Sequence, residues 1–225
     1  MEETCGARLT MNYMVPGGVM AELHPDFQRK VKEFISLYKA KVKEYDELIS
    51  GNVIFINRMK GVGNLSAADA ISFGCSGPTA RGSGVSCDIR KLYPYDAYDA
   101  VQFDEVIEKE GDSLARYRVR IGEMNQSISI IEQLIDNIPE GDFQAKTKAV
   151  LKLPKGEFYT RVETARGELG VYIVSEGATT PYRIKFRSPG FSNLSALDHM
   201  ARGSKIGDLI AMMGTLDLVI PDIDR

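Results

Sequence analysis

The chain has 225 residues, 44% of them hydrophobic, and its 28 Lys and Arg residues nearly balance its 31 Asp and Glu residues. This hydrophobic content is enough for a folded core, and the formal net charge of -3 provides no field to attract nucleic acid, which we exclude as a partner. No apolar run reaches the roughly 18 residues needed to span a bilayer, and the N-terminal sequence lacks the pattern of a signal peptide.

Two segments have the apolar spacing of long amphipathic helices. The first covers about residues 26–49, follows Pro25 and carries apolar side chains at steps of four and three: Phe27, Val31, Phe34, Tyr38, Val42, Tyr45 and Leu48. The second covers about residues 112–138, before Pro139, and repeats the spacing at Leu114, Tyr117, Ile121, Met124, Ile128, Ile131 and Leu134. We expect the two helices to pack antiparallel as the main layer of a bundle, along Phe34, Tyr38, Ile121, Met124 and Ile128.

Residues 73–98, FGCSGPTARGSGVSCDIRKLYPYDAY, have few periodic apolar positions and many Gly, Ser and Pro residues, which predicts a long loop. Loops of this length within a compact domain are usually functional or disordered. The basic residues and tyrosines argue against disorder. We expect an ordered loop in which Arg81, Arg90 and Lys91 contact a partner or a carboxylate.

After residue 142 the apolar pattern changes to a period of two, which indicates β-strands. We predict strands at residues 156–165, 168–176 and 181–188, and the GATTP sequence between the last two suits a hairpin. In the last strand, three apolar side chains alternate with Arg183, Lys185 and Arg187. We therefore expect a small antiparallel sheet on the bundle, with one basic face that is either solvated or meets an acidic neighbour.

A last helix is predicted at about residues 204–213 and ends at Gly214. The remaining tail, GTLDLVIPDIDR, alternates apolar residues with Asp217, Asp222 and Asp224, an unusual pattern for a chain end. Two interpretations stay open: the tail is a half-buried strand that closes a sheet, or it lines a cavity in which acids are needed.

The predicted elements define the fold class as α+β, mainly a helical bundle with a small antiparallel sheet. We expect a single domain. Residues 1–141 form its mainly helical part, 142–190 the sheet, and 191–225 a helix with the acidic tail.

The residues carry no motif of a self-sufficient enzyme: no P-loop, no GxSxG, no HExxH and no dinucleotide fingerprint. Cys5, Cys75 and Cys87 form no CxxC pair, and His24 and His199 stand alone, so no metal site is expected within the chain. The odd number of cysteines favours a reducing cytoplasm, where we expect them to be small packing residues.

Three stretches together resemble one family. They are GVGNLSAADAISFGCSGPTARGSGVSCDIRKLYPY, RVETARGELGVYIVSEGATTPYRIKFRSPGFSNLSAL and the terminal LDLVIPDIDR. They resemble the 49 kDa-type D subunit of respiratory complex I, the NADH:quinone oxidoreductase. This family is similar in turn to the large subunit of nickel-iron hydrogenases, whose Arg-Gly-x-Leu-Gly segment corresponds to residues 166–170. The resemblance implies a hydrogenase-large-subunit-like fold.

The same resemblance gives the acidic tail a role. In the hydrogenase relatives two thiolates near the C-terminus hold nickel, and these positions correspond to Val219 and Asp222, which cannot replace a soft thiolate pair. The resemblance implies that the tail, above all Asp217, lines a former metal cavity that complex I uses for quinone reduction. A desolvated carboxylate beside a quinone can relay protons, because burial raises its pKa. The alternative is that Asp217 accepts backbone hydrogen bonds at a turn.

Partners and cofactors follow from the resemblance as well. Arg8, in CGARLTMNY, corresponds to a stretch near the terminal iron-sulfur cluster, which a B-type partner subunit holds, although the His that relatives carry at position 10 or 11 is replaced here by Thr10 and Met11. Other partners implied are a C-type subunit, possible as a fusion, and a membrane H-type subunit, with NAD(H) bound elsewhere in the complex. The chain itself would bind no cofactor, and quinone would be a substrate.

Further motif residues are assigned to partner contacts or to structure: Arg81, Arg90, Lys91, Arg166, Glu168 and Arg183. The implied location is peripheral, on the cytoplasmic side of the cell membrane. Family members carry well over a hundred residues upstream, with the His and Tyr that bind the quinone head group, so the chain is expected to be the C-terminal part of a family member of the D type. The competing hypothesis is a scaffold derived from a hydrogenase large subunit, without a redox role.

Overall fold

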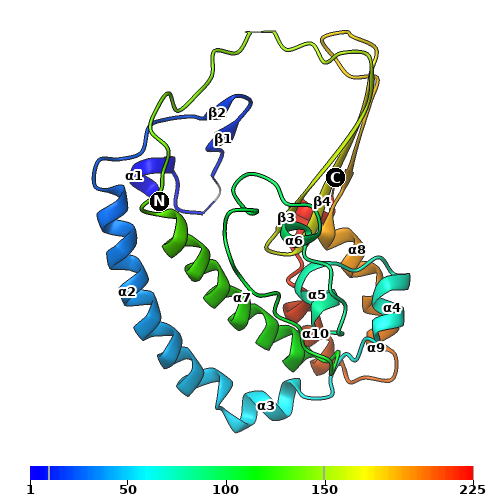
Figure 1. Cartoon of the computed structure of the whole chain (residues 1–225). Coiled ribbons are helices and arrows are strands. Elements are labelled where there is room, and N and C mark those ends of the chain that lie inside the picture. Colours follow the sequence, from blue (N-terminus) through cyan, green and yellow to red (C-terminus); the bar gives the residue numbers. More distant parts are fainter. Residues whose placement is uncertain (10, 149, 225) are drawn as a thin grey trace.

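The computed structural model describes residues 1–9, 11–148 and 150–224, so Thr10, Ala149 and Arg225 lie outside the described residues. Figure 1 shows helices in the lower part of the molecule and a sheet that projects from them as an arm. The described helices and strands form the α+β fold expected from the sequence.

Both long helices are confirmed. α2 covers Phe27–Tyr45 and continues into a π-helical turn, Asp46–Ser50, while α7 covers Ser113–Leu134. Asp112 caps α7, because its side chain accepts a hydrogen bond from the Ala115 N–H (2.8 Å). The two helices run antiparallel, as predicted, with the C-terminal end of α7 beside the start of α2 (Figure 1).

The contact between α2 and α7 differs from the prediction. Of the five side chains expected in it, Ile128 is buried, and the others are partly buried or exposed: Tyr38, Ile121, Phe34 (53% exposed) and Met124 (38% exposed). Ion pairs near solvent join the helices instead, for example Lys39 to Glu132 at 2.6 Å. The prediction that Phe34 and Met124 form the centre of a bundle is wrong, because the core of the chain lies elsewhere.

The hydrophobic core lies between residues 62–87 and the C-terminal helices. Its buried members are Leu65, Ala70, Cys75, Ala80, Ala196, Met200, Met212 and Leu216. The first of these regions contains α4 (Ala67–Ser72) and α5 (Gly77–Arg81). Two more short helices flank it, α3 (Val53–Met59) before it and α6 (Ile89–Leu92) after it.

The segment predicted as a loop, 73–98, is ordered but contains α5 and α6 and supplies core residues. Its small side chains let short helices pack closely, which a search for apolar periodicity does not detect. Cys75 is a buried packing residue and Cys87 packs against the core, as expected. Burial raises the pKa of both thiols to about 11, so they are protonated at neutral pH.

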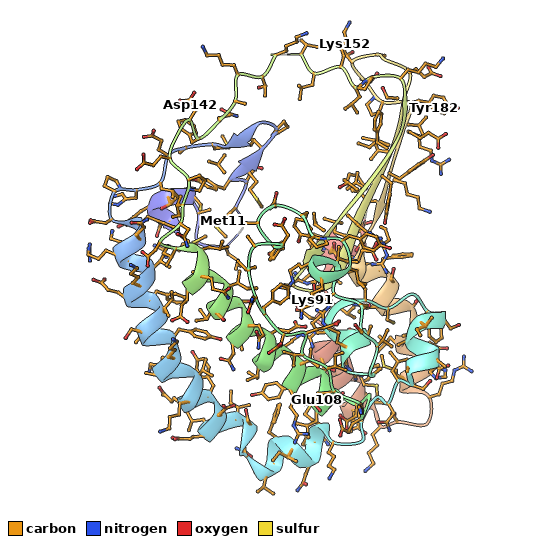
Figure 2. All side chains as sticks on the ribbon, viewed as in Figure 1. Met11, Lys91, Glu108, Asp142, Lys152 and Tyr182 are labelled. Atoms are coloured by element: carbon orange, nitrogen blue, oxygen red, sulfur yellow. The ribbon has the colours of Figure 1, made fainter. Side chains whose placement is uncertain are left out.

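The three predicted strands are confirmed. β3 (Gly156–Thr164), β4 (Gly167–Ser175) and β5 (Arg183–Arg187) form an antiparallel sheet in the order β3-β4-β5. Thr164 pairs with Gly167 across a two-residue turn, and this turn points toward the helices. The sheet does not lie flat on a bundle. Its far end projects away, where Figure 2 shows Tyr182, which is 74% exposed.

The described C-terminal region contains four helices joined by short turns. α8 (Pro189–Ser195), α9 (Leu197–Ala201) and α10 (Ile206–Leu216) are followed by α11 (Ile220–Ile223). α10 continues past Gly214 to Leu216, three residues beyond the predicted last helical residue, 213. Of the two interpretations of the tail, the strand is wrong, because Asp217 turns the chain with a left-handed backbone (φ 55°) and Pro221 occupies the first turn of α11.

A short helix and a hairpin occupy the N-terminal region. α1 covers Glu2–Cys5, and β1 (Met14–Val15) pairs with β2 (Gly18–Val19). Neither was predicted, since elements of two to four residues carry no periodic signal. Within the described ranges, no helix combines the length and the hydropathy that crossing a lipid bilayer requires.

Candidate functional site

A cavity of about 370 Å³ lies where four parts of the chain meet: the segment 73–98, α7, the β3–β4 turn and the C-terminal tail after α10. Six of its lining side chains are charged: Arg81, Arg90, Arg120, Glu123, Glu163 and Asp217. Met124, Ser127, Thr164 and Ala165 complete the lining. The structure therefore supports the second interpretation of the tail, in which an acid faces a cavity.

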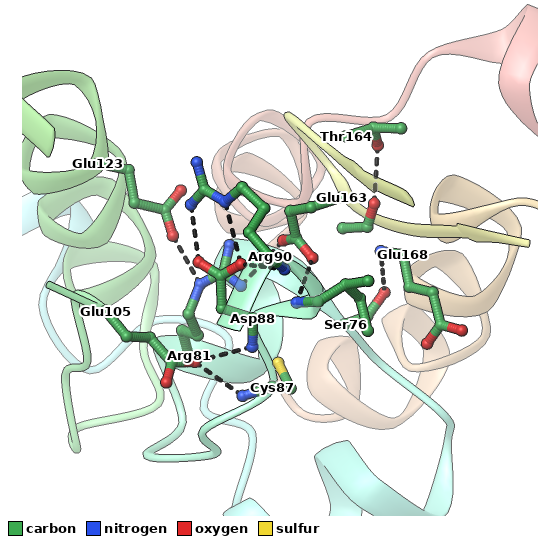
Figure 3. A network of polar contacts seen from close by, with 12 residues as sticks. Ser76, Arg81, Cys87, Asp88, Arg90, Glu105, Glu123, Glu163, Thr164 and Glu168 are labelled. Atoms are coloured by element: carbon green, nitrogen blue, oxygen red, sulfur yellow. Dashed lines mark hydrogen bonds and ion pairs between the residues drawn. The ribbon is translucent and has the colours of Figure 1, made fainter. Parts of the chain in front are cut away.

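Arg81 is the centre of a buried charge cluster (Figure 3). Its side chain is 1% exposed, at the end of α5. Its Nε donates a hydrogen bond to Glu123 Oε1 at 2.6 Å, and its Nη1 lies 2.9 Å from Glu163 Oε1, at an angle that makes this contact an ion pair rather than a hydrogen bond. One guanidinium thus holds two carboxylates, from α7 and from β3.

Both carboxylates are acids that hold their protons more tightly than usual. Burial raises the pKa of Glu123 and of Glu163, while the charge of Arg81 opposes the rise. Burial acts to lower the pKa of Arg81, but the attraction of the two carboxylates outweighs it and the pKa is raised. Acids tuned in this way can hold and release a proton at a cavity wall.

A second group of polar contacts fixes the loop around Glu163 (Figure 3). The carboxylate of Glu163 accepts a hydrogen bond from the Ile89 N–H (3.2 Å), and its own N–H donates to the Tyr95 hydroxyl (3.0 Å). Arg90 binds Asp88 in a bidentate manner, at 3.0 and 2.7 Å. Arg90 also lines the cavity, and Asp88 occupies two of its hydrogen-bond donors.

Asp217 is held at the cavity by Arg166, the second residue of the β3–β4 turn. The Arg166 Nε donates to the backbone carbonyl oxygen of Asp217 at 3.1 Å and lies 3.5 Å from its Oδ2 atom. The turn reaches the helices because Gly77 has no side chain: a Cβ there would lie 2.5 Å from the Arg166 carbonyl oxygen. Gly77 also has φ +63°, a conformation that glycine adopts easily.

Arg116 connects α7 to the loop before α4 and to α10. Its side chain is fully buried and donates to Gly63 O, Gly111 O, Ser113 Oγ and Thr215 Oγ1. These acceptors come from the loop before α4, from α7 and its N-terminal approach, and from α10. The arginine therefore joins α7, which lines the cavity, to the loop before α4 and to α10. Its burial lowers its pKa to about 10.

Comparison with known proteins shows which family the chain belongs to. Its sequence matches the family described as "Respiratory-chain NADH dehydrogenase, 49 Kd subunit" over residues 1–152 and 147–225. The chain belongs to this family. It is 56% identical over 224 residues to the C/D subunit of the NADH-quinone oxidoreductase of Bacteroides fragilis (strain YCH46), and 45% identical over 225 residues to the D subunit of the NADH-quinone oxidoreductase of Bacillus cytotoxicus.

These alignments cover 100% of this chain but 42% of the first relative and 62% of the second. The chain thus spans about two fifths to three fifths of the length of the curated relatives. The resemblance stated from the motifs is confirmed. Among the described residues of this 49 kDa-family chain, no group of three or more His, Cys, Asp or Glu side chains is arranged to hold a metal ion.

The structure gathers some of the predicted residues of this family member and separates others. Arg81, Arg90 and Asp217 line the cavity, and Arg166 contacts Asp217. Val219 and Asp222 do not line it. Val219 precedes α11, and Asp222 Oδ2 accepts a hydrogen bond from the Gly190 N–H in α8 at 3.0 Å.

The remaining predicted residues lie outside the cavity. Arg8 is 84% exposed and pairs with Glu2 at 2.9 Å. Lys91, labelled in Figure 2, lies over the Phe103 ring at 5.1 Å. Glu168 and Arg183 lie on β4 and β5; Glu168 accepts a hydrogen bond from the Tyr159 hydroxyl, and Arg183 is exposed. Their roles toward partners stay predictions.

Sequence reasoning missed Arg120, Glu123 and Glu163. A signal for the first two was present: Arg116, Arg120 and Glu123 follow each other at steps of four and three, so they share one face of α7. We took the neighbouring apolar stripe as the buried face, although α7 buries charged side chains next to it. Glu163 had no such signal, because alternation in a strand does not show which face lies against a charge.

Proposed function

We propose that this chain is the C-terminal part of the D subunit of a proton-translocating NADH:quinone oxidoreductase, and that its cavity forms part of the quinone-reduction site. The observation that carries the proposal is the meeting of buried acids with a raised pKa, Glu123 and Glu163, and of Asp217 in one cavity. Family membership supports it.

The chemistry needs such groups. Reduction of a quinone to a quinol adds two electrons and two protons, one proton to each carbonyl oxygen. The electrons would come from a reduced iron-sulfur cluster of a partner subunit, and the protons from carboxyl groups at the cavity. A carboxyl with a raised pKa is protonated in a larger fraction of molecules than an ordinary one. It can give up that proton as negative charge develops on the quinone oxygen, and is then protonated again from solvent.

The complex would supply what this chain does not. We propose a B-type subunit that holds the terminal cluster near Arg8, a membrane H-type subunit, NAD(H) bound elsewhere in the complex, and a peripheral position on the cytoplasmic side of the membrane. A C-type subunit is a further partner, and it can be fused to the same polypeptide, as the C/D designation of the Bacteroides fragilis relative indicates for that protein.

The test is Asp217→Asn in the assembled complex that contains this chain. The substitution keeps size and polarity but removes the charge and the exchangeable acid proton. We expect quinone reduction per assembled complex to fall about tenfold or more, while NADH still reduces the cluster, because a missing acid-base group typically lowers rates by about 10²–10⁴-fold. Asp224→Asn, an exposed acid of the same tail, is the matched control.

One observation favours the scaffold hypothesis. Asp217 ends α10 and is fixed by Arg166, as a purely structural residue would be. In that case Asp217→Asn weakens the ion pair with Arg166 (3.5 Å) and lowers the yield of assembled complex, while each assembled complex turns over normally. Turnover per assembled complex therefore separates the two functions.

A further inference from the structure

A single buried amide connects α8 to the start of α5 and to the β3–β4 turn. Asn193 of α8 is fully buried (0% exposed). Its Oδ1 atom accepts a hydrogen bond from the Ser76 N–H at 3.1 Å, and its Nδ2 atom donates to the Arg166 carbonyl oxygen at 3.2 Å. These two contacts fix the orientation of the amide, because a backbone N–H can only donate and a carbonyl oxygen can only accept.

The segments that Asn193 connects carry the charged residues of the cavity. Ser76 is the N-cap residue of α5, the short helix that ends at Arg81. Arg166 belongs to the turn that follows β3, the strand that carries Glu163. Asn193 therefore fixes the distance between a helix and a turn, and the Arg81–Glu163 ion pair depends on that distance.

A second set of hydrogen bonds holds the start of β4 beside the amide. The Ser76 Oγ atom accepts from the Glu168 N–H at 3.1 Å (Figure 3) and from Arg187 Nη1 at 3.0 Å. Arg187 also donates to the carbonyl oxygens of Glu168 (2.6 Å) and Gly74 (2.7 Å). These contacts secure the first residues of β4, and Asn193 adds the contact to the turn that precedes them.

We propose that Asn193 is a positioning residue for the proposed quinone reduction, because it holds the β3–β4 turn against α5. This inference rests on the proposed function. The turn held in this way keeps Glu163 2.9 Å from Arg81. It also keeps Arg166 3.5 Å from the Asp217 carboxylate. Asn193 itself does not line the cavity, so it acts through these two pairs.

The experiment measures quinone reduction by the assembled complex with Asn193→Leu. Leucine has nearly the same branched shape as asparagine but makes no hydrogen bond. We expect turnover per assembled complex to fall about 10- to 100-fold, because a displacement of about 1 Å at a reaction site can lower a rate about 10²-fold.

The pH dependence of the rate distinguishes positioning from a purely structural role. Burial raises the pKa of Glu163, and the charge of Arg81 opposes this rise. If the turn moves away from α5, the opposition weakens and the pKa rises further. The alkaline limb of the pH–rate profile, in which the proton donor loses its proton, should therefore move to higher pH in Asn193→Leu.

Two other variants make the result specific. Ser195→Ala is the matched control on the same helix, because the Ser195 hydroxyl donates to the carbonyl oxygens of Ser192 and Phe73 and not to the turn. If Asn193→Leu fails to assemble, Ser76→Ala tests the same junction. It keeps the N–H that Asn193 binds but removes the acceptor of Glu168 and Arg187, so we expect the same shift of the alkaline limb, to a smaller extent.

The outcomes separate this proposal from the proposed function. A lower yield of complex with wild-type turnover and pH profile overturns the positioning role of Asn193. A lower turnover with the wild-type pH profile also overturns it, because Glu163 would then still lie beside Arg81. Asp217→Asn in the same assay tests the function independently: reduced turnover in that variant, with unchanged turnover in Asn193→Leu, overturns the positioning role alone.

Discussion

Replacing Arg81 by Met should show how much the stability of the buried charge cluster depends on one guanidinium. The side chain is 1% exposed, and its partners Glu123 and Glu163 are 18% and 4% exposed. Arg81→Met keeps an apolar stem of similar length but removes the ion-pair partner of two buried carboxylates. Breaking a buried ion pair from one side typically lowers the free energy of unfolding by about 3–5 kcal/mol, and we expect a loss in this range.

The loss should depend on pH in a defined direction. Burial raises the pKa of both glutamates in the folded chain. A carboxyl whose pKa is higher in the folded than in the unfolded state stabilises the fold below its unfolded pKa, about 4.3 for Glu, and this contribution is lost as the pH rises through the folded pKa. Without Arg81 the folded pKa rises further, so the deficit of the variant should be larger at pH 8 than at pH 5.

Urea unfolding of the purified chain, followed by circular dichroism at both pH values, measures these differences. Two further variants make the result specific. Adding Glu123→Gln and Glu163→Gln to Arg81→Met removes the uncompensated charges and should restore at least half of the lost stability. Arg29→Met removes a solvent-exposed pair on α2 and should change little. A deficit below about 1 kcal/mol, or one that grows on acidification, contradicts the reasoning.

Two further outcomes are expected. Gly77→Ala should lower the free energy of unfolding by about 1–3 kcal/mol, because the added Cβ meets backbone atoms of the β3–β4 turn. Gly74 also has a positive φ but open space around it, so Gly74→Ala should lower stability less in the same thermal melt. Equal losses for the two variants would argue against the close contact at Gly77. Cys75 and Cys87 should resist alkylation by iodoacetamide at pH 7.5 until the chain unfolds, because burial raises the pKa of each thiol to about 11. Mass spectrometry measures the rate at which each cysteine is modified. Modification of either one as fast as the less buried Cys5 would contradict this expectation.

The spacing of apolar residues along the sequence was enough to predict the long helices and strands. The periods of 3.6 and 2 in the sequence identified α2, α7 and the strands β3 to β5, because each of these elements repeats its side-chain pattern over several turns or residue pairs. Short helices such as α5 and α6 repeat nothing, so the segment that contains them looked like a loop. The family resemblance also came from sequence, through stretches of about 35 residues and the terminal LDLVIPDIDR.

The sequence also pointed to Arg81, Arg90, Arg166 and Asp217, but it could not say which of them meet. Arg81 and Glu163 are 82 positions apart and form an ion pair at 2.9 Å only because the β3–β4 turn docks against α5 at a glycine. Arg166 and Asp217 meet for the same reason.

What the sequence by itself determined is therefore the chain's family, its α+β class and the residue types available for chemistry. The tertiary structure decided which charges are buried together. The sequence of a helix or a strand does not show whether a carboxyl group faces water or a guanidinium, and the pKa of that group depends on this difference. Glu123 and Glu163 became candidates for proton transfer only when folding removed them from water and placed them around Arg81.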